Sequence, residues 1–305
     1  MNNNLPTSHT ARLINGKAIA EHIRAEVKIE AEALTLTKGI KPRIVFILVG
    51  NNPASEIYVR NKGISSEEVG FSHETLRFPE SISEAGLLEE IAKLNADRIT
   101  HALLCQMPLP KHISEEKVIE AMDPKKDIDG FHPINVGRLS IGKGDYFAPC
   151  TPAGVMEMML RDNIDVSGKH VVIVGRSNIV GKPLAALLVQ KMKGANAIVT
   201  LAHTGAGSRL PEFTRSADIL IAAMGVPHAI TIDMVREGAV VIDVGQNVIP
   251  DSTKRSGTRL VGDVDFDNVK YVASAITPVP GGVGPMTIAM VMKNTLAAAI
   301  RQMKN

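Results

Sequence analysis

The stretch His170-Val-Val-Ile-Val-Gly-Arg-Ser-Asn-Ile-Val-Gly181 contains the pattern that decides the fold of this chain. Four β-branched residues run into Gly175, as expected for a buried parallel strand that ends in a tight turn. The turn leads into a predicted helix, whose free N–H groups and dipole favour a bound diphosphate. The stretch therefore predicts the strand, loop and helix of a dinucleotide-binding domain.

The loop departs from the usual Gly-x-Gly-x-x-Gly pattern, because Ser177 and Val180 replace its second and third glycines. Read alone, it is equally compatible with a structural turn between a strand and a helix. Arg176 follows the first glycine and can hold the 2′-phosphate of NADP through paired hydrogen bonds. No Asp or Glu closes the next predicted strand, which ends Leu201-Ala-His-Thr204, where an NAD enzyme would bind the ribose. Both features favour NADP over NAD.

Strands and helices alternate along the chain, which predicts parallel βαβ units with right-handed crossovers. The expected strands are 43–50, 72–78, 99–105, 170–174, 197–201, 218–222, 239–244 and 271–276, and the main expected helices are 56–69, 83–96, 115–122 and 283–302. Ser55 is expected to cap the first of these helices, and Gly70 to end it. Between Asp123 and Pro152 the pattern lapses, so a long functional loop is predicted there.

These elements predict a two-domain α/β protein, as a length of 305 residues favours. Residues 1–150 and 284–305 are expected to form a parallel βα catalytic domain, and residues 151–283 a Rossmann-like dinucleotide-binding domain. The final helix should pack back on the first domain, since the preceding strands already complete the second. The Asn-rich N-terminus is expected to be a disordered tail.

Composition and charge exclude several classes of partner. The net charge is +2 and the basic residues form no stripe, so nucleic acid is not an expected partner. Two cysteines cannot form a disulfide framework, and no Cys or His cluster has zinc spacing, so no metal is expected. A signal peptide is not evident, and no apolar run approaches the ~20 residues of a membrane span. The protein is therefore expected to be cytoplasmic.

A candidate catalytic pair lies on the first of the predicted helices. Tyr58 and Lys62 are four residues apart and share a helix face, although such pairs are common on solvated helices. Gln106 follows the predicted strand 99–105 and is held by the proline-rich turn Met107-Pro-Leu-Pro110. Because ligands of open α/β sheets bind at the carboxyl ends of strands, Lys62 and Gln106 are expected to meet there. An amide orients the amine without holding it protonated, as a carboxylate would, and this permits proton transfer near neutral pH.

Two other segments have features of a ligand site. Asp129, in Lys126-Asp-Ile-Asp-Gly-Phe131, can either occupy a surface turn or bind a heterocycle with adjacent N–H donors, and spacing does not decide between them. The segment Thr277-Pro-Val-Pro-Gly-Gly-Val-Gly-Pro-Met-Thr287 joins the last strand to the last helix. Its prolines stiffen the backbone and its glycines permit close approach of a ligand.

Five blocks, in order along nearly the whole chain, resemble the bifunctional methylenetetrahydrofolate dehydrogenase/cyclohydrolase (FolD) family. They are Gln106-Met-Pro-Leu-Pro110, Lys126-Asp-Ile-Asp-Gly-Phe131, Pro149-Cys-Thr-Pro152, the loop from Gly175 to Gly181, and the segment from Thr277 to Thr287. The resemblance implies oxidation of 5,10-methylenetetrahydrofolate with NADP+ and hydrolysis of the methenyl product to 10-formyltetrahydrofolate. It also implies a role in one-carbon metabolism, including purine biosynthesis, and a homodimer.

The resemblance also assigns roles to residues. It implies that Lys62 is the main catalytic group, that Tyr58 stacks on the folate, that Gln106 positions the lysine, and that Asp129 binds the amino edge of the pterin. It places Ser55, Cys150, Val279, Pro280 and Gly281 around the substrate, and Gly175, Arg176, Ser177, Ile179 and Thr204 at NADP. The alternatives are a dehydrogenase-only member of the family, another two-domain NAD(P)-dependent dehydrogenase, or a non-catalytic dinucleotide-binding module.

The chain departs from the family pattern at two places. Ile64 stands where the family usually has a second lysine, and it follows Gly63, which costs roughly 1 kcal/mol against Ala inside a helix. The run His203-Thr-Gly-Ala206 lacks a basic residue that the family carries near the cofactor. The first departure bears on the hydrolytic step and the second on the preference for NADP.

Overall fold

The computed structural model describes residues 10–303, so the predicted N-terminal tail lies almost wholly outside the described residues. The chain divides into two compact units, each of which is described by itself. One comprises Ala20–Cys150 with Ile288–Asn305, and we call it the three-stranded unit after its sheet. The other comprises Met1–Ile19 with Thr151–Thr287, and we call it the six-stranded unit.

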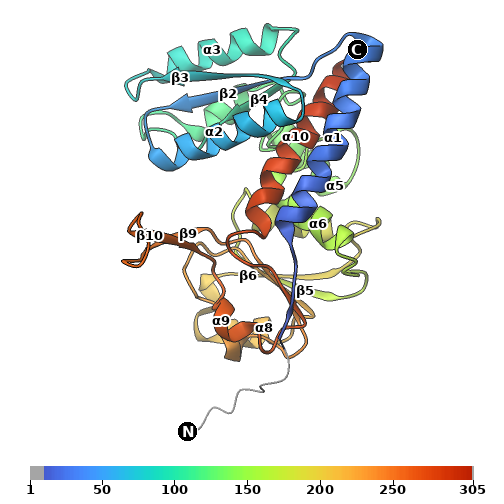
Figure 1. Ribbon diagram of the computed structural model, residues 1–305, viewed down its shortest axis with the longest axis vertical. Helices are drawn as coiled ribbons and strands as arrows, with labels where there is room; N and C mark the ends of the chain where they lie inside the picture. Colours follow the sequence, from blue (N-terminus) through green and yellow to red (C-terminus); the bar gives the residue numbers. More distant parts are fainter. Residues whose placement is uncertain (1–9, 304–305) are drawn as a thin grey trace. The chain divides into compact units, whose positions relative to one another are not determined.

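The three-stranded unit has β2 (Arg43–Val49) at the centre of a parallel sheet, between β3 (Ser72–Phe78) and β4 (Ala102–Cys105). Its helices are most of α1 (Gly16–Lys38), α2 (Pro53–Glu68), α3 (Glu84–Ala96), α4 (Glu115–Ala121), α5 (Pro133–Ile141) and most of α10 (Val283–Gln302). Helices α2 and α3 lie on opposite faces of the sheet (Figure 1). Alternate residues of β2 pack with Leu87 and Ile91 of α3, so the strand is buried on both faces and its apolar run is continuous.

The six-stranded unit has a parallel sheet in the order β1-β11-β8-β7-β5-β6. Its strands are β1 (Arg12–Leu13), β5 (His170–Val174), β6 (Ile198–Ala202), β7 (Ile219–Ala222), β8 (Val240–Asp243) and β11 (Ala275–Ile276), with a separate antiparallel pair β9 (Asn247–Pro250) and β10 (Thr258–Val261). Its helices are α6 (Cys150–Arg161), α7 (Gly181–Leu188), α8 (Leu210–Thr214) and α9 (Phe266–Val269), with short 3-10 turns η1 (Thr204–Arg209) and η2 (Ile232–Met234). The predicted α/β fold with parallel sheets is confirmed.

The greater part of α10 packs in the three-stranded unit, as predicted. Asn294 Nδ2 donates to the carbonyl oxygens of Ile128 and Ala148, and Gln302 Nε2 donates to that of His101. By length and composition alone α10 could also span a membrane, contrary to the expectation that no apolar run is long enough. Buried residues such as Val291 and Leu296 account for its apolar character, which is that of a core helix.

Three local predictions were wrong. Asn52, and not Ser55, caps α2, because its side chain accepts from the backbone N–H groups of Ala54 and Ser55 and Pro53 starts the helix. The predicted loop at 123–152 contains α5, which begins at the His132 cap and ends at Gly142 in the left-handed region. The predicted strand at 271–276 is reduced to two residues, Ala275–Ile276.

The start of the chain differs from its predicted place in the first domain. Strand β1 pairs with β11, and residues up to Ile19 group with the six-stranded unit. A two-residue strand carries no periodic pattern, so its partner sheet cannot be inferred from sequence. The functional assignment of the two predicted domain ranges stays a prediction.

Candidate active site

Lys62 and Gln106 form a hydrogen-bonded pair in the three-stranded unit. Lys62 Nζ, on α2, donates to Gln106 Oε1 at 3.0 Å. Gln106 follows the last residue of β4, and its Nε2 donates to the carbonyl oxygen of Met107 at 2.8 Å. The second bond fixes the amide, so that its oxygen faces the amine. The pair therefore lies at the carboxyl edge of the sheet, where the strand order places it.

Burial makes the Lys62 amine less basic. The side chain is 8% exposed, and burial lowers its pKa from the ordinary value of lysine, while Asp129 acts in the opposite direction. The thiols of Cys105 and Cys150 also lie near the amine. Burial raises the pKa of Cys105 to about 12 and that of Cys150 well above its usual value, so both thiols are neutral at physiological pH. Asp129 is therefore the charged neighbour that opposes the effect of burial on the pKa of Lys62.

Tyr58 and Ser55 lie on the same helix as Lys62. Tyr58 is one turn before the lysine, its side chain is half-buried, and this partial burial raises the pKa of its hydroxyl. A half-buried tyrosine offers a ring face for stacking against a flat ligand. Ser55 is buried within the first turn of α2. Its hydroxyl does not cap the helix, because the Asn52 side chain is the N-cap.

Asp129 lies on the loop between α4 and α5 and is partly exposed. It influences the pKa of both Lys62 and Cys150, so its carboxylate lies near both groups. The loop is held by Asn294 of α10, which donates to the carbonyl of Ile128, the residue before Asp129. Sequence reasoning missed Asn294, because no local signal connects a helix residue with a loop 166 positions earlier.

Gly63 is explained by the neighbouring strand. A Cβ built on Gly63 would lie 3.0 Å from Cε1 of His73, a residue of β3. The imidazole is held in place, because its Nε2 lies 3.1 Å from Glu67 Oε1 and its ring faces Phe46 at 6.1 Å between centroids. The His73 ring therefore occupies the volume that a side chain at position 63 would fill, and it packs α2 against the sheet.

Gly63→Ala is expected to destabilise the wild-type protein but to stabilise a His73→Ala variant. Alanine in a helix interior is about 1 kcal/mol more favourable than glycine. This gain in stability should appear in the His73→Ala background, where the imidazole ring is absent. When His73 is present, we expect the clash between the alanine Cβ and the His73 ring to cost more than the helix gains in stability. Urea unfolding of the two single variants and the double variant gives their coupling energy. Additive effects of the two substitutions would contradict the contact.

Asp127 is a buried carboxyl in the same loop. Its Oδ2 accepts from the His132 N–H at 2.8 Å and from Asn135 Nδ2 at 3.0 Å, whereas the buried Oδ1 has no hydrogen-bond partner within residues 10–303. Burial raises the pKa of Asp127 from 3.8 to about 6. The folded state therefore keeps a proton that the unfolded chain releases, and stability falls as the pH rises through this range.

Asp127→Asn is expected to stabilise the protein at about pH 8 by up to about 3 kcal/mol, because the amide carries no charge to desolvate. The gain should shrink as the pH is lowered to about 5, where ionisation costs less. Urea midpoints at both pH values measure it. Asp243→Asn is the matched control, because burial also raises the pKa of Asp243 to about 6. Its carboxylate, however, accepts from the backbone N–H groups of Gly245, Asp263 and Val264. The amide nitrogen of asparagine would face these donors, so Asp243→Asn should not stabilise the protein. Equal effects of the two substitutions would refute the interpretation.

The loop after β5 in the six-stranded unit is packed so closely that two of its residues must be glycine. A Cβ on Gly175 would lie 2.1 Å from the Ala223 carbonyl oxygen, and its φ of +134° is unfavourable for other residues. A Cβ on Gly181 would lie 2.0 Å from the Gly175 carbonyl oxygen. The first turn of α7 therefore folds directly over the end of β5, as a phosphate cradle requires.

The predicted cofactor residues border this loop. Arg176, Ser177 and Ile179 are exposed, and the Ser177 hydroxyl accepts from the Val180 N–H at 3.1 Å. No hydrogen bond or ion pair occupies the Arg176 guanidinium among residues 10–303, so it is available to an anion. Thr204 follows β6, the neighbour of β5, and the Gly175 N–H donates to the Ala202 carbonyl at 2.8 Å. These residues fit a nucleotide whose phosphates lie over the loop.

The predicted substrate loop at Val279, Pro280 and Gly281 is also rigid. The Val279–Pro280 peptide is cis, and Gly281 has a φ of +107°. The Lys17 N–H donates to the Gly281 carbonyl at 2.9 Å, which ties the loop to the start of α1. The loop lies in the six-stranded unit, and its role towards substrate stays a prediction.

A glycine-lined phosphate loop and a buried lysine–amide pair, each at the carboxyl edge of a parallel sheet, define a nucleotide-dependent α/β enzyme. Comparison with known families is more specific. Residues 14–129 match the tetrahydrofolate dehydrogenase/cyclohydrolase catalytic domain, and residues 149–303 match the NAD(P)-binding domain of the same family. The chain belongs to the tetrahydrofolate dehydrogenase/cyclohydrolase family.

Individual relatives cover nearly the whole chain. The bifunctional protein FolD of Prosthecochloris aestuarii is 51% identical over 290 residues, which cover 95% of this chain and 98% of the relative. The crystal structure of the Campylobacter jejuni bifunctional FolD enzyme has a TM-score of 0.89 at 44% identity and covers 95% of this chain and 99% of its own. That of the Trypanosoma brucei enzyme, complexed with NADP and an inhibitor, has a TM-score of 0.91 at 36% identity and covers 97% and 99%.

Proposed function

We propose that this protein oxidises 5,10-methylenetetrahydrofolate to the 5,10-methenyl form with NADP+ and then hydrolyses that product to 10-formyltetrahydrofolate. The activity named for the relatives supports both steps. The observation that carries the hydrolytic step is the buried Lys62 amine bound to Gln106 Oε1. A monofunctional dehydrogenase has no evident need for a buried amine of lowered pKa.

The residues of this chain suggest how hydrolysis proceeds. Because burial lowers the pKa of Lys62, a larger fraction of the amine is neutral near pH 7 and can accept a proton from attacking water. Gln106 keeps the nitrogen lone pair in position without adding a negative charge. In this proposal Asp129 binds the N–H edge of the pterin, and the half-buried Tyr58 ring stacks on the same group. When bound, NADP+ supplies the hydride acceptor for the first step.

The test is an assay of the purified protein with methylenetetrahydrofolate and either NADP+ or NAD+. Reduced cofactor and methenyl absorbance are followed separately, and both signals should rise before the methenyl signal decays. Absence of cofactor reduction with either nucleotide would refute the proposal. Reduction with a stable methenyl product would leave the dehydrogenase-only alternative, and would direct attention to Gly63 and Ile64.

Preference for NADP is assigned to Arg176. Arg176→Gln is expected to raise KM for NADP+ by about 10- to 100-fold, since a hydrogen bond to a charged group contributes about 1.5–3 kcal/mol. KM for NAD+ should stay within about twofold, because that nucleotide has no 2′-phosphate. Lys191→Gln, which removes an exposed cation elsewhere in the six-stranded unit, is the control. Equal increases in KM for both nucleotides would show that Arg176 does not bind the 2′-phosphate.

A homodimer formed through the six-stranded unit is part of the proposal. Strand β6 is an edge strand with Ile198 64% and Leu201 37% exposed, and Val248 of β9 is 68% exposed. Exposed apolar edges are usually covered by another chain. Sedimentation at micromolar concentration should give twice the chain mass.

The two reduced cysteines agree with a cytoplasmic enzyme.

A further inference from the structure

Two hollows lie at the amino ends of the two parallel sheets. One, of about 470 Å³, is lined by residues at or just before the starts of β5, β7, β8 and β11. The other, of about 420 Å³, is lined by residues at or just before the starts of β2, β3 and β4. The candidate active-site residues Gln106 and Gly175 follow the opposite, carboxyl ends of the strands. Neither hollow is therefore part of the sites described above.

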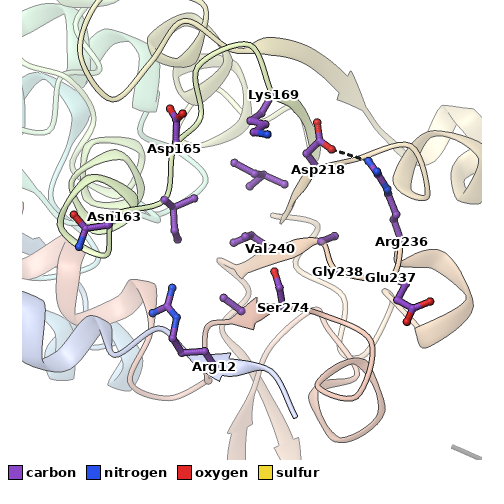
Figure 2. A pocket seen from close by; sticks show the side chains of 14 residues that line it. Arg12, Asn163, Asp165, Lys169, Asp218, Arg236, Glu237, Gly238, Val240 and Ser274 are labelled. Carbon is purple, nitrogen blue, oxygen red and sulfur yellow. Dashed lines mark hydrogen bonds and ion pairs between the residues drawn. The ribbon is translucent and has the colours of Figure 1, made fainter. Parts of the chain in front are cut away.

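The hollow in the six-stranded unit has mixed charge that is largely paired. Figure 2 shows acidic and basic side chains interleaved around it, with Arg236 bound to Asp218 at 2.6 Å. Arg12 forms an ion pair with Asp162 at 2.7 Å, and two further carboxylates lie in the lining. Because cations and anions are balanced, this hollow has no charge preference that would select a ligand.

The hollow in the three-stranded unit differs in charge. Lys41, Arg43, Arg98 and His101 line it, and none of its lining residues among those described is a carboxylate. Glu74 is outside the lining and binds Arg43 Nη2 at 2.6 Å. We call this feature the amino-edge hollow. Its lining leaves an excess of positive charge.

Asp97 lies beside the amino-edge hollow and offsets part of its positive charge. Its carboxylate accepts from the Ile99 N–H at 3.1 Å and from the Thr100 hydroxyl at 2.6 Å, and the bond from Thr100 lowers its pKa, so it stays ionised. Asp97 and Glu74 together balance two of the three cations Lys41, Arg43 and Arg98, and one positive charge remains in excess. Neither Lys41 nor Arg98 has an ion pair or hydrogen bond through its side chain within residues 10–303. Both cations are exposed and available to a ligand.

Arg43 supplies a donor that lacks an acceptor. Its Nε is buried and has no hydrogen-bond partner in the described part of the chain. An unsatisfied buried donor costs about 1–3 kcal/mol, and more for a charged group. His101 supplies another donor, because its Nδ1 accepts from the Arg43 backbone N–H at 3.1 Å and the ring proton is then on Nε2. Burial lowers the pKa of His101, so its imidazole is neutral near pH 7 and donates a single N–H.

We propose that the amino-edge hollow binds a small organic anion with at least two oxyanion charges, such as a phosphate ester or a polycarboxylate. The exposed part of the Arg43 guanidinium and the His101 N–H donate to one oxyanion group, and Lys41 and Arg98 add positive charge beside it. The rest of the lining includes Ile40, Ile99 and Met303, of which Ile99 is 64% exposed. These side chains suit an apolar ligand body.

The test uses the full-length protein saturated with NADP+, so that the nucleotide site cannot bind the probe. Inorganic pyrophosphate and citrate are titrated separately by calorimetry, to distinguish phosphate from carboxylate chemistry. At least one should bind with a single site. The double variant Lys41→Gln/Arg98→Gln should weaken that binding at least about tenfold, which corresponds to about 1.4 kcal/mol. Both side chains are exposed, so the variant should fold as the wild type does.

The matched control is Lys28→Gln/Lys191→Gln, which removes two exposed cations that are not part of the lining and should change affinity less than about twofold. Arg43→Lys retains the charge but loses the planar guanidinium, and should weaken binding as the double variant does. Absence of binding by the wild type up to about 10 mM of either anion, or equal loss in the control, would overturn the proposal. Catalytic rates are measured in parallel, so a failure of the proposed enzymatic activity would be recognised separately.

Discussion

Lys62→Met is expected to abolish hydrolysis of methenyltetrahydrofolate while reduction of NADP+ by methylenetetrahydrofolate remains measurable. A positioned general base contributes about 10²- to 10⁴-fold to a rate, and methionine has no group that accepts a proton. Methionine suits the position, because the lysine side chain is 8% exposed and the two side chains are of similar length. The loss should therefore reflect chemistry and not a collapsed core.

Hydrolysis is measured by the decay of methenyl absorbance in the absence of nucleotide, and folate affinity by titration of the same variant. A decay rate that falls with unchanged affinity assigns Lys62 to the chemical step. Arg60→Met is the control, since it removes an exposed cation two residues earlier on α2. If Lys62→Met hydrolysed methenyltetrahydrofolate at the wild-type rate, the lysine would have no role in the mechanism.

The rate of hydrolysis by the wild type should also depend on pH. Burial lowers the pKa of Lys62, so the neutral amine forms at a lower pH than in an exposed lysine. The hydrolytic rate should rise as the amine loses its proton, and this limb of the profile should be absent in Lys62→Met. Asp129 opposes the effect of burial, which sets a limit on how far the profile can move.

Much of the fold could be predicted because buried parallel strands leave a local signature. The β-branched runs at β2 and β5 end in glycine, and each was placed correctly to within one residue. The Lys62–Gln106 pair could be predicted for a related reason. The carboxyl ends of parallel strands share one edge, so residues after different strands meet without any pattern that connects them in sequence.

Contacts between distant segments could not be predicted in this way. The need for glycine at position 63 comes from the His73 ring on the adjacent strand, and the pattern of α2 alone shows it only as an unfavourable residue. Helix α5 was not predicted, because the high content of turn-forming residues between Asp123 and Pro152 indicated a loop. The sequence nevertheless contains a local helix signal there, namely the N-cap at His132 and the C-terminal glycine at position 142.

The two candidate sites lie in different compact units, and this allows the two proposed activities to be separated by mutation. Lys62 and Gln106 belong to the three-stranded unit, whereas the loop from Gly175 to Gly181 belongs to the six-stranded unit. Hydrolysis of the methenyl compound consumes water and uses no nucleotide. A substitution that damages only the phosphate loop should therefore spare hydrolysis.

Gly181→Ala is that substitution, and it is expected to weaken NADP+ reduction strongly while hydrolysis continues. A Cβ at this position would lie 2.0 Å from the Gly175 carbonyl oxygen and 3.1 Å from the Arg176 Cα, both of which are backbone atoms. Backbone on both sides of the contact must move, so the loop loses the shape that accommodates a diphosphate. Gly181 has a φ that other residues adopt readily, so the effect is steric and not conformational strain.

The expected result is at least a 100-fold rise in KM for NADP+, on the order of 3 kcal/mol, because a shift of about 1 Å in a positioned group costs about that factor. Gly137→Ala is the control: it also replaces a helical glycine, but no atom lies within 4 Å of the added Cβ, and alanine favours its helix. Normal NADP+ kinetics in Gly181→Ala would show that the loop after β5 is a structural turn and that the nucleotide binds elsewhere. Loss of both activities would instead show that hydrolysis depends on the nucleotide loop, against the separation argued from the two units.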